Sequence, residues 1–250
     1  MLAAAPAVRD PTGMSKISRF LTSTIGAKVA MAVTGLLLSL FVVAHLLGNL
    51  LVFKGREAMN DYAQMLQHLG IWLWVARLGL LALFATHIAL AIRLRARNQA
   101  ARPVRYVAEH TIQASFASRT MILSGLLILA FVAMHLMHFT LGWLEPSKYA
   151  LHETVKQNGV EVVRHDVFAM VVAGFHNDLF VLLYLVCMVV LGLHLSHGLS
   201  SLFQSLGLRH PAYVKGVQLG GRLVAVALAV GFSLIPLAVR LGFCGAGGAQ

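Results

Sequence analysis

Four histidines lie inside four separate long apolar runs of the chain, at His45, His87, His135 and His194. Ionisable side chains are costly in hydrocarbon, so a histidine within a membrane-spanning segment indicates a function. A neutral imidazole can bind a metal ion through one ring nitrogen without adding charge to the membrane. Four such residues, one in each run, could supply two pairs of axial ligands for two b-type haems. The sequence therefore predicts a membrane protein that carries electrons.

The composition places most of the chain in a lipid bilayer. Of the 250 residues, 58% are hydrophobic and 12% are charged, and the mean hydropathy is +0.78, whereas soluble domains are about a quarter charged. Lipid offers no partner to unpaired backbone groups, so the spanning segments must be helices. Cys187 falls in a span and Cys244 near the C-terminus, and no CxxC or CxxCH pattern occurs. These facts argue against a disulfide, covalently attached haem or an iron–sulfur cluster within this chain.

Five apolar runs are long enough to cross a membrane, each needing about 20 residues. They are predicted at 25–53, 71–92, 121–144, 177–203 and 217–241. The expected fold class is an all-α integral membrane protein, a five-helix transmembrane bundle over residues 25–250 that encloses two b haems. Residues 1–24 are expected to form an N-terminal arm whose beginning is disordered and lacks the features of a signal peptide, and Met14 could be an alternative start. The apolar stretch 167–175 predicts a short interfacial helix or loop.

The distribution of basic residues predicts the orientation of the bundle. Thirteen of the 20 basic residues share one side with the N-terminus, namely Arg9, Lys16, Arg19, Lys28, Arg93, Arg95, Arg97, Arg102, Arg105, Arg119, Arg209, Lys215 and Arg222. Only Asp10 and Glu109 accompany them, while the other side holds seven basic and seven acidic residues. The positive-inside rule then puts the N-terminus in the cytoplasm. It also accounts for the net charge of +11 without nucleic acid, although a basic inner face could in addition dock a soluble partner.

With this topology the four histidines pair by depth. His45 and His135 lie in the outer halves of the first and third spans, and His87 and His194 lie in the inner halves of the second and fourth. A haem with two imidazole ligands needs two histidines at one depth on facing helices. The outer pair and the inner pair each meet this requirement.

A weak internal repeat supports the pairing. Gly35 precedes His45 by ten residues, and Gly125 precedes His135 by the same interval. Ten helical residues rise about 15 Å, which reaches from the outer level to the inner one. Each glycine is therefore expected near the inner haem, where a missing side chain lets a flat macrocycle approach the backbone. Close packing between helices is the alternative role for both glycines.

Other histidines compete for these roles. His138 and His197 each follow a chosen ligand by three residues, but the repeat favours His135 and depth favours His194. The remaining pair could bond a haem propionate or a quinone, or have a structural role only. His176, before the fourth span, could likewise bond a propionate or quinone or be solvated.

Four segments resemble the dihaem cytochrome b subunit of succinate dehydrogenase and fumarate reductase. They are FVVAHLLGN around His45, FATHIALAIRLRARN around His87, SGLLILAFVAMH ending at His135 and LHLSHGLSSL around His194. The resemblance covers nearly all of the chain from about Ser15 onward, and the order, spacing and number of the spans carry it. The family has one haem ligand on each of its first four helices and none on the fifth, and here the fifth run contains no histidine.

The resemblance implies the membrane anchor of respiratory complex II, which also serves the tricarboxylic acid cycle, in a bacterial cytoplasmic membrane. A flavoprotein and an iron–sulfur protein would dock on its cytoplasmic face. Electrons from succinate would reach the inner haem on His87 and His194, then the outer haem on His45 and His135. They would reduce a quinone, menaquinone or ubiquinone, in this subunit, which itself performs no chemistry on dicarboxylates.

One departure from the family favours succinate oxidation over fumarate reduction. Some fumarate reductases have a proton-carrying glutamate two residues before the fourth-helix ligand, and here that residue is Gly192. Two alternatives stay open. The chain could be a dihaem cytochrome b of a hydrogenase, a formate dehydrogenase or an ascorbate-type reductase. It could also be a haem-free transporter, although Pro236 is the only proline in a predicted span, unlike the broken helices of transporter substrate sites.

Overall fold

The structure, a computed structural model, describes residues 15–101, 115–157 and 159–244. The predictions for residues 1–14, including Met14, and for the loop residues Arg102, Arg105 and Glu109 lie outside this part. The described part of the arm forms helix α1 (Lys16–Thr22), which begins where the side chain of Ser15 accepts a hydrogen bond from the amide of Ser18.

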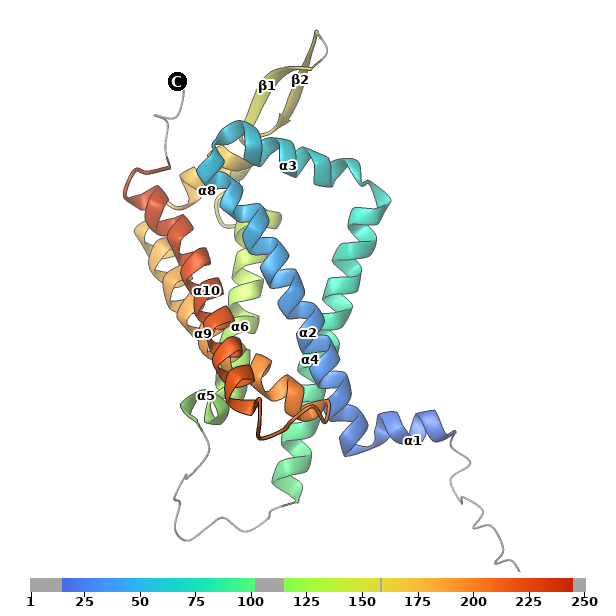
Figure 1. The fold of residues 1–250 in the computed structure, drawn as a ribbon. Helices are drawn as coiled ribbons and strands as arrows, with labels where there is room; N and C mark the ends of the chain where they lie inside the picture. The colour runs from blue at the N-terminus through green and yellow to red at the C-terminus, as the bar shows by residue number, and fades with distance from the viewer. Residues whose placement is uncertain (1–14, 102–114, 158, 245–250) are drawn as a thin grey trace, which may run out of the picture.

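Within the described residues, five helices are long and apolar enough to span a membrane, which confirms the predicted all-α membrane bundle at this level. They are α2 (Thr24–Asn49) with the short extension η1 (Leu50–Lys54), α4 (Ile71–Ala100), α6 (Met121–His135) with the π-helical extension η2 (Leu136–Thr140), α9 (Asp178–Ser205) and α10 (Val214–Arg240). In Figure 1, α2 crosses the bundle between α4 on one side and the α9–α10 pair on the other. Helix α6 packs against α9.

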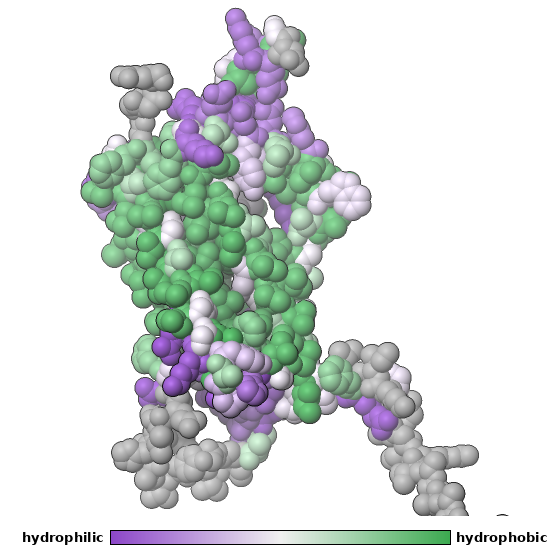
Figure 2. Space-filling view, viewed as in Figure 1, coloured by the Kyte–Doolittle hydropathy of each residue, from purple (hydrophilic) through white to green (hydrophobic). Residues whose placement is uncertain are grey.

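The surface agrees with this placement. Figure 2 shows a wide hydrophobic band around the long helices, with hydrophilic residues gathered beyond both of its edges. Helix α4 continues to Ala100, past the predicted end at residue 92, because arginine favours helix and its charged head can stay in water. The third helical run ends at Thr140 and not at residue 144, since Gly142 takes a positive φ of 67° that terminates it.

The two ends of the bundle differ in construction. One end, named here the hairpin end, carries α3 (Arg56–His68), α7 (Pro146–Tyr149), α8 (Val167–Gly174) and two antiparallel strands, β1 (His152–Gln157) and β2 (Val160–His165). The other end, named the α1 end, carries α1 and the short helix α5 (Phe116–Arg119). The hairpin and α3 were not among the predicted elements; both lie between the predicted spans and leave the all-α class of the bundle unchanged.

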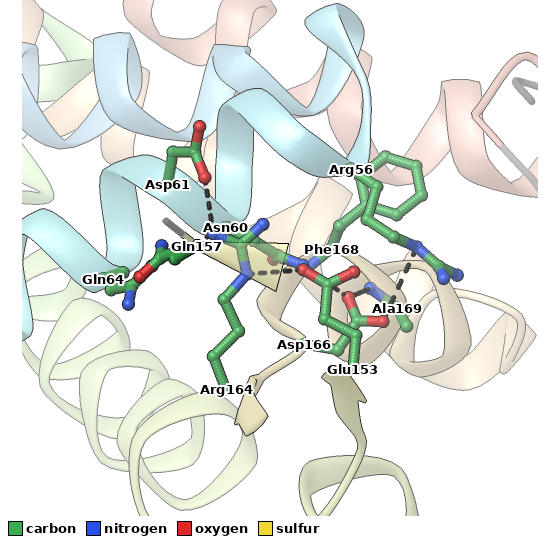
Figure 3. Close-up of polar contacts among 10 residues, drawn as sticks. All are labelled: Arg56, Asn60, Asp61, Gln64, Glu153, Gln157, Arg164, Asp166, Phe168 and Ala169. Atoms are coloured by element: carbon green, nitrogen blue, oxygen red, sulfur yellow. Dashed lines mark hydrogen bonds and ion pairs between the residues drawn. The ribbon is translucent and has the colours of Figure 1, made fainter. Parts of the chain in front are cut away.

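A polar network holds the hairpin end together (Figure 3). The side chain of Asn60, only 1% exposed, donates to Glu153 Oε1 at 2.8 Å and to Asp166 Oδ1 at 2.9 Å. Its own carbonyl oxygen accepts from the amide of Phe168 at 2.9 Å. Asp166 also caps α8 by accepting from the amide of Ala169 at 2.9 Å. One buried amide of α3 therefore fixes where α8 begins, and α8 in turn packs over the ends of the spanning helices.

Arg164 of β2 completes the network (Figure 3). Its Nε donates to Glu153 Oε1 at 2.7 Å, and its Nη1 donates to Asp61 Oδ1 at 2.5 Å and to Gln64 Oε1 at 3.1 Å. Burial opposes the charged form, but the hydrogen bonds that Arg164 donates to Asp61 and Glu153 outweigh it and raise the pKa of Arg164. This guanidinium ties the hairpin to α3.

Candidate functional site

His45 and His135 face each other near the hairpin end. His45 lies one turn before the end of α2 and His135 is the last residue of α6. Their ring centroids are 5.8 Å apart and their planes are nearly perpendicular, at 84°. Phe41 stacks on His45 at 5.4 Å and Phe131 stacks on His135 at 5.8 Å, while Phe232 of α10 lies 5.9 Å from His45. Three helices thus build an aromatic surround for this histidine pair.

His87 and His194 lie towards the α1 end, and each contacts a hydroxyl group of a neighbouring helix. Thr34 Oγ1 of α2 is 3.1 Å from His87 Nδ1 of α4. Ser124 Oγ of α6 is 3.0 Å from His194 Nδ1 of α9. The two imidazoles are within electrostatic reach of one another. The internal repeat of the sequence therefore corresponds to two equivalent contacts between neighbouring helices.

The repeated glycines lie against these same imidazoles. A Cβ at Gly35 would stand 3.2 Å from His87 Cε1, and one at Gly125 would stand 3.6 Å from His194 Cε1. The structure therefore places each glycine beside the histidine of a neighbouring helix at the α1 end, His87 or His194, as the ten-residue interval predicts. Gly192 has a different neighbour, since a Cβ there would stand 3.1 Å from Ala229 Cβ of α10. Gly192 thus lets α10 pack closely on α9.

His138 does not join the paired histidines. It is 2% exposed and its ring lies between those of Phe139 and Phe180, with centroid distances of 3.9 and 4.1 Å. Its Nδ1 is 3.2 Å from the Tyr184 hydroxyl and its Nε2 is 3.1 Å from Glu145 Oε2. With both nitrogens engaged, this imidazole has none to give to a metal. Among the described contacts, His135 is the third-helix histidine that faces His45.

His197 and His176 also lie apart from the pairs. Ser124 and Gly125 contact His194 and not His197. No hydrogen bond or ring contact of His197 occurs among the described residues. His176 is exposed at the turn between α8 and α9.

Tyr184 and Glu145 belong to the site but were not predicted from the sequence. The Tyr184 hydroxyl is 3.1 Å from His135 Nδ1, so this buried tyrosine connects His135 to His138. Tyr184 precedes His194 by ten residues, the interval that separates the two levels on α2 and α6, and this could have revealed it. Glu145 also binds Lys148 Nζ at 2.5 Å. Burial favours a higher pKa for Glu145, but the hydrogen bonds from Lys148 and His138 outweigh it and hold that pKa below its usual value.

The residues fit a prosthetic group bound between paired imidazoles. With a metal–nitrogen bond of about 2 Å, as for histidine on zinc, two axial imidazole centroids lie about 6 Å apart. The centroids of His45 and His135 are 5.8 Å apart, and the angle between their planes is unrestricted because each ring can turn about its own bond. Helix α4 packs chiefly against α2 and contains no buried residue. His87 itself is half-buried against Thr34 and Gly35 of α2, while much of the rest of α4 is exposed within the described chain, which suits a large apolar group beside it.

No known protein family, curated protein or solved structure matches this chain. The fold and the site together define a helical membrane bundle with paired intramembrane histidines.

Proposed function

We propose that this chain is the membrane-anchor cytochrome b subunit of a succinate:quinone oxidoreductase. Two haems b would be held by His45 with His135 and by His87 with His194. In this proposal electrons from a flavoprotein and an iron–sulfur protein reach a membrane quinone, menaquinone or ubiquinone, across the two histidine levels. Haem iron with two imidazole ligands supplies one-electron redox chemistry.

One observation carries the proposal: three of the four histidines have Nδ1 beside a hydroxyl group of a neighbouring helix. These hydroxyls belong to Thr34, Ser124 and Tyr184, at 3.1, 3.0 and 3.1 Å. A metal-bound histidine almost always donates its second ring N–H to a hydrogen-bond acceptor, which fixes the tautomer and the orientation of the ring, and a hydroxyl oxygen can act as that acceptor. The arrangement leaves Nε2 of each ring available to a metal.

The hydroxyls of the α1 end can accept this hydrogen bond because their own protons have another acceptor. Thr34 Oγ1 lies 2.9 Å from the carbonyl oxygen of Ala30, and Ser124 Oγ lies 3.1 Å from that of Met121. A hydroxyl that donates to its own helix accepts the N–H of the histidine on the next one. The helix backbone thereby orients both inner imidazoles.

The proposed orientation puts the α1 end on the cytoplasmic side of a bacterial inner membrane. The described basic residues outnumber the acidic ones at that end. Arg93 and Arg97 of α4 donate to the carbonyl oxygen of Thr22 at 2.6 and 3.0 Å, so they also hold α1 in place. The flavoprotein and iron–sulfur subunits would dock at this end.

The first experiment is a dithionite-reduced minus oxidised spectrum of the purified complex, with haem quantified per chain. Two low-spin b haems are expected, one lost in His45→Ala or His135→Ala and the other in His87→Ala or His194→Ala. His197→Ala is the matched control on α9 and is expected to keep both haems. Absence of haem from the intact complex would contradict the proposal and favour a haem-free transporter. If the complex contains haem together with hydrogenase or formate dehydrogenase subunits, the proposed haem sites would stand, but the assignment to a succinate:quinone oxidoreductase would be wrong.

A further inference from the structure

A hydrogen-bonded chain runs from His135 to the surface of the hairpin end. From His135 Nδ1 it passes through the Tyr184 hydroxyl at 3.1 Å and then to His138 Nδ1 at 3.2 Å. From His138 Nε2 it continues to Glu145 at 3.1 Å, and Glu145 binds Lys148 at 2.5 Å. The chain joins α6, α9, η2 and α7, and it ends at a partly exposed ammonium group.

The donors and acceptors available in this hydrogen-bonded chain allow its hydrogen bonds to point in only one direction. The Glu145 carboxylate carries no hydrogen, so His138 Nε2 must carry one and donate it. A neutral His138 then has a bare Nδ1, which accepts the single hydrogen of the Tyr184 hydroxyl. The Tyr184 oxygen is left to accept, and His135 Nδ1–H is its donor. His135 Nε2 is consequently the nitrogen without a hydrogen.

The charges around His138 support its neutral form. Glu145 is already compensated by Lys148 at 2.5 Å. A positive His138 would add an uncompensated charge to a site that is 2% exposed and lies between the rings of Phe139 and Phe180. Burying such a charge without a free counter-charge is strongly unfavourable.

The packing around His138 leaves its ring little room to turn over, which would be needed to reverse the direction of these hydrogen bonds. A Cβ at Gly174, the last residue of α8, would stand 3.2 Å from His138 Nε2 and 2.9 Å from Phe139 Cε1. Helix α8 therefore lies directly over the imidazole that Glu145 contacts. Its position is fixed by Asn60 and Asp166 of the network in Figure 3.

We infer that Glu145 and His138 are positioning residues for His135: acting through Tyr184, they keep hydrogen on Nδ1 and leave Nε2 free to bind metal. This rests on the proposed function only in that the metal is the iron of the hairpin-end haem. The carboxylate also strengthens the hydrogen bond that His135 donates, which makes its imidazole a more basic ligand and favours oxidised iron. The reduction potential of one haem thus depends on a glutamate that does not touch it.

The test is a redox titration of the intact complex, with both haems bound, in the wild type and in Glu145→Gln. Glutamine keeps an oxygen that can accept from His138 but removes the charge. The expected result is a higher midpoint potential for the haem that His45→Ala removes, an unchanged potential for the other, and two haems per chain. The near-infrared magnetic circular dichroism band of that haem, which reports on its axial imidazoles, is expected to shift with it. Glu161→Gln, an exposed glutamate of β2, is the control and should shift neither haem.

The double variant Glu145→Gln with Tyr184→Phe shows whether Glu145 acts on the haem through the hydrogen bonds or by direct electrostatic interaction. Tyr184→Phe interrupts the chain, so it should raise the same potential, and Glu145→Gln should add little in that background. Equal shifts from Glu145→Gln with and without the Tyr184 hydroxyl would overturn the inference, as would equal effects of Glu145→Gln and Glu161→Gln. In both cases two haems would still be bound, so the proposed function would stand. A wild-type complex without haem would instead refute both.

Discussion

The two ends of the bundle hold their histidines by different means. At the α1 end, His87 and His194 each contact one hydroxyl, from Thr34 and Ser124, and that hydroxyl also bonds to its own helix backbone. At the hairpin end, His135 contacts a phenol that belongs to a chain of side chains ending in an ion pair. The first arrangement depends only on neighbouring helices. The second depends on charges outside the membrane-spanning segments.

The difference has a physical cause in how each end is covered. The seven acidic residues that the structure describes all lie at the hairpin end, namely Glu57, Asp61, Glu145, Glu153, Glu161, Asp166 and Asp178. They give that end a buried polar network and a fixed α8. The equivalent contacts of the α1 end are uncharged. We therefore expect substitutions of charged residues to affect the hairpin end, and substitutions that change side-chain volume to affect the α1 end.

The largest expected effect on stability is that of Arg164→Leu. This removes a buried cation and leaves the carboxylate of Glu153, which is 14% exposed, without its charged partner. Breaking a buried ion pair in this way costs about 3–5 kcal/mol. The measurement is the thermal midpoint of unfolding, followed by reaction of Cys187 and Cys244 with a thiol-specific dye, since both are free and Cys244 is buried.

Arg56→Leu is the matched control for this prediction. Arg56 pairs with Asp166 at 3.6 Å, but its side chain is 53% exposed. Removing such a pair costs less than about 1 kcal/mol. Equal losses of stability from the two variants would mean that the buried network does not hold the hairpin end.

An intermediate effect is expected from Gly35→Ala, compared with Gly125→Ala. The new methyl group would lie 3.2 Å from the imidazole of His87 in the first and 3.6 Å from that of His194 in the second. The first distance forces the ring to move, at a cost of about 1–3 kcal/mol, while the second is an ordinary contact. Any gain in helix propensity is common to both, so their difference isolates the contact.

Haem content and the thermal midpoint measure this difference. If the chain holds the two proposed haems, Gly35→Ala should lower the occupancy of the α1-end haem more than Gly125→Ala does, and neither variant should affect the hairpin-end haem. Indistinguishable variants would show that neither imidazole depends on its glycine.

The sequence predicts the parts of the site that depend on helical spacing. Because a helix rises by a constant amount per residue, the interval from Gly35 to His45 was enough to place Gly35 at the level of His87. Spacing alone could not show that His138 lies between the rings of Phe139 and Phe180, since Phe180 comes from another helix. The interval from Tyr184 to His194 could have given the level of Tyr184, but not the partner of its hydroxyl, which lies 49 residues away in the chain.

The hairpin was missed although its sequence contains a local signal. Asn158 and Gly159 lie between two segments rich in β-branched residues, a pattern typical of a tight β-turn. The segment is polar, so it carries no signal for a membrane span. The role of Glu145 could not be predicted either, since it depends on how η2 and α7 bring it back to His138.

The smallest expected effect is on stability in acid, and it depends on Glu145. Its folded-state pKa is depressed, because the hydrogen bonds from Lys148 and His138 outweigh burial. A depressed pKa means that the carboxylate stabilises the fold fully above its ordinary pKa of 4.5, and that this contribution is lost as the pH falls through the lower folded-state value. Glu145→Gln should therefore lower the thermal midpoint slightly at pH 7, by less than about 1 kcal/mol in stability. The deficit should shrink as the pH falls below 4.5 and disappear once Glu145 of the wild type is protonated. A deficit that stays constant down to low pH would mean that the ion pair at the end of the chain contributes through packing and not through charge.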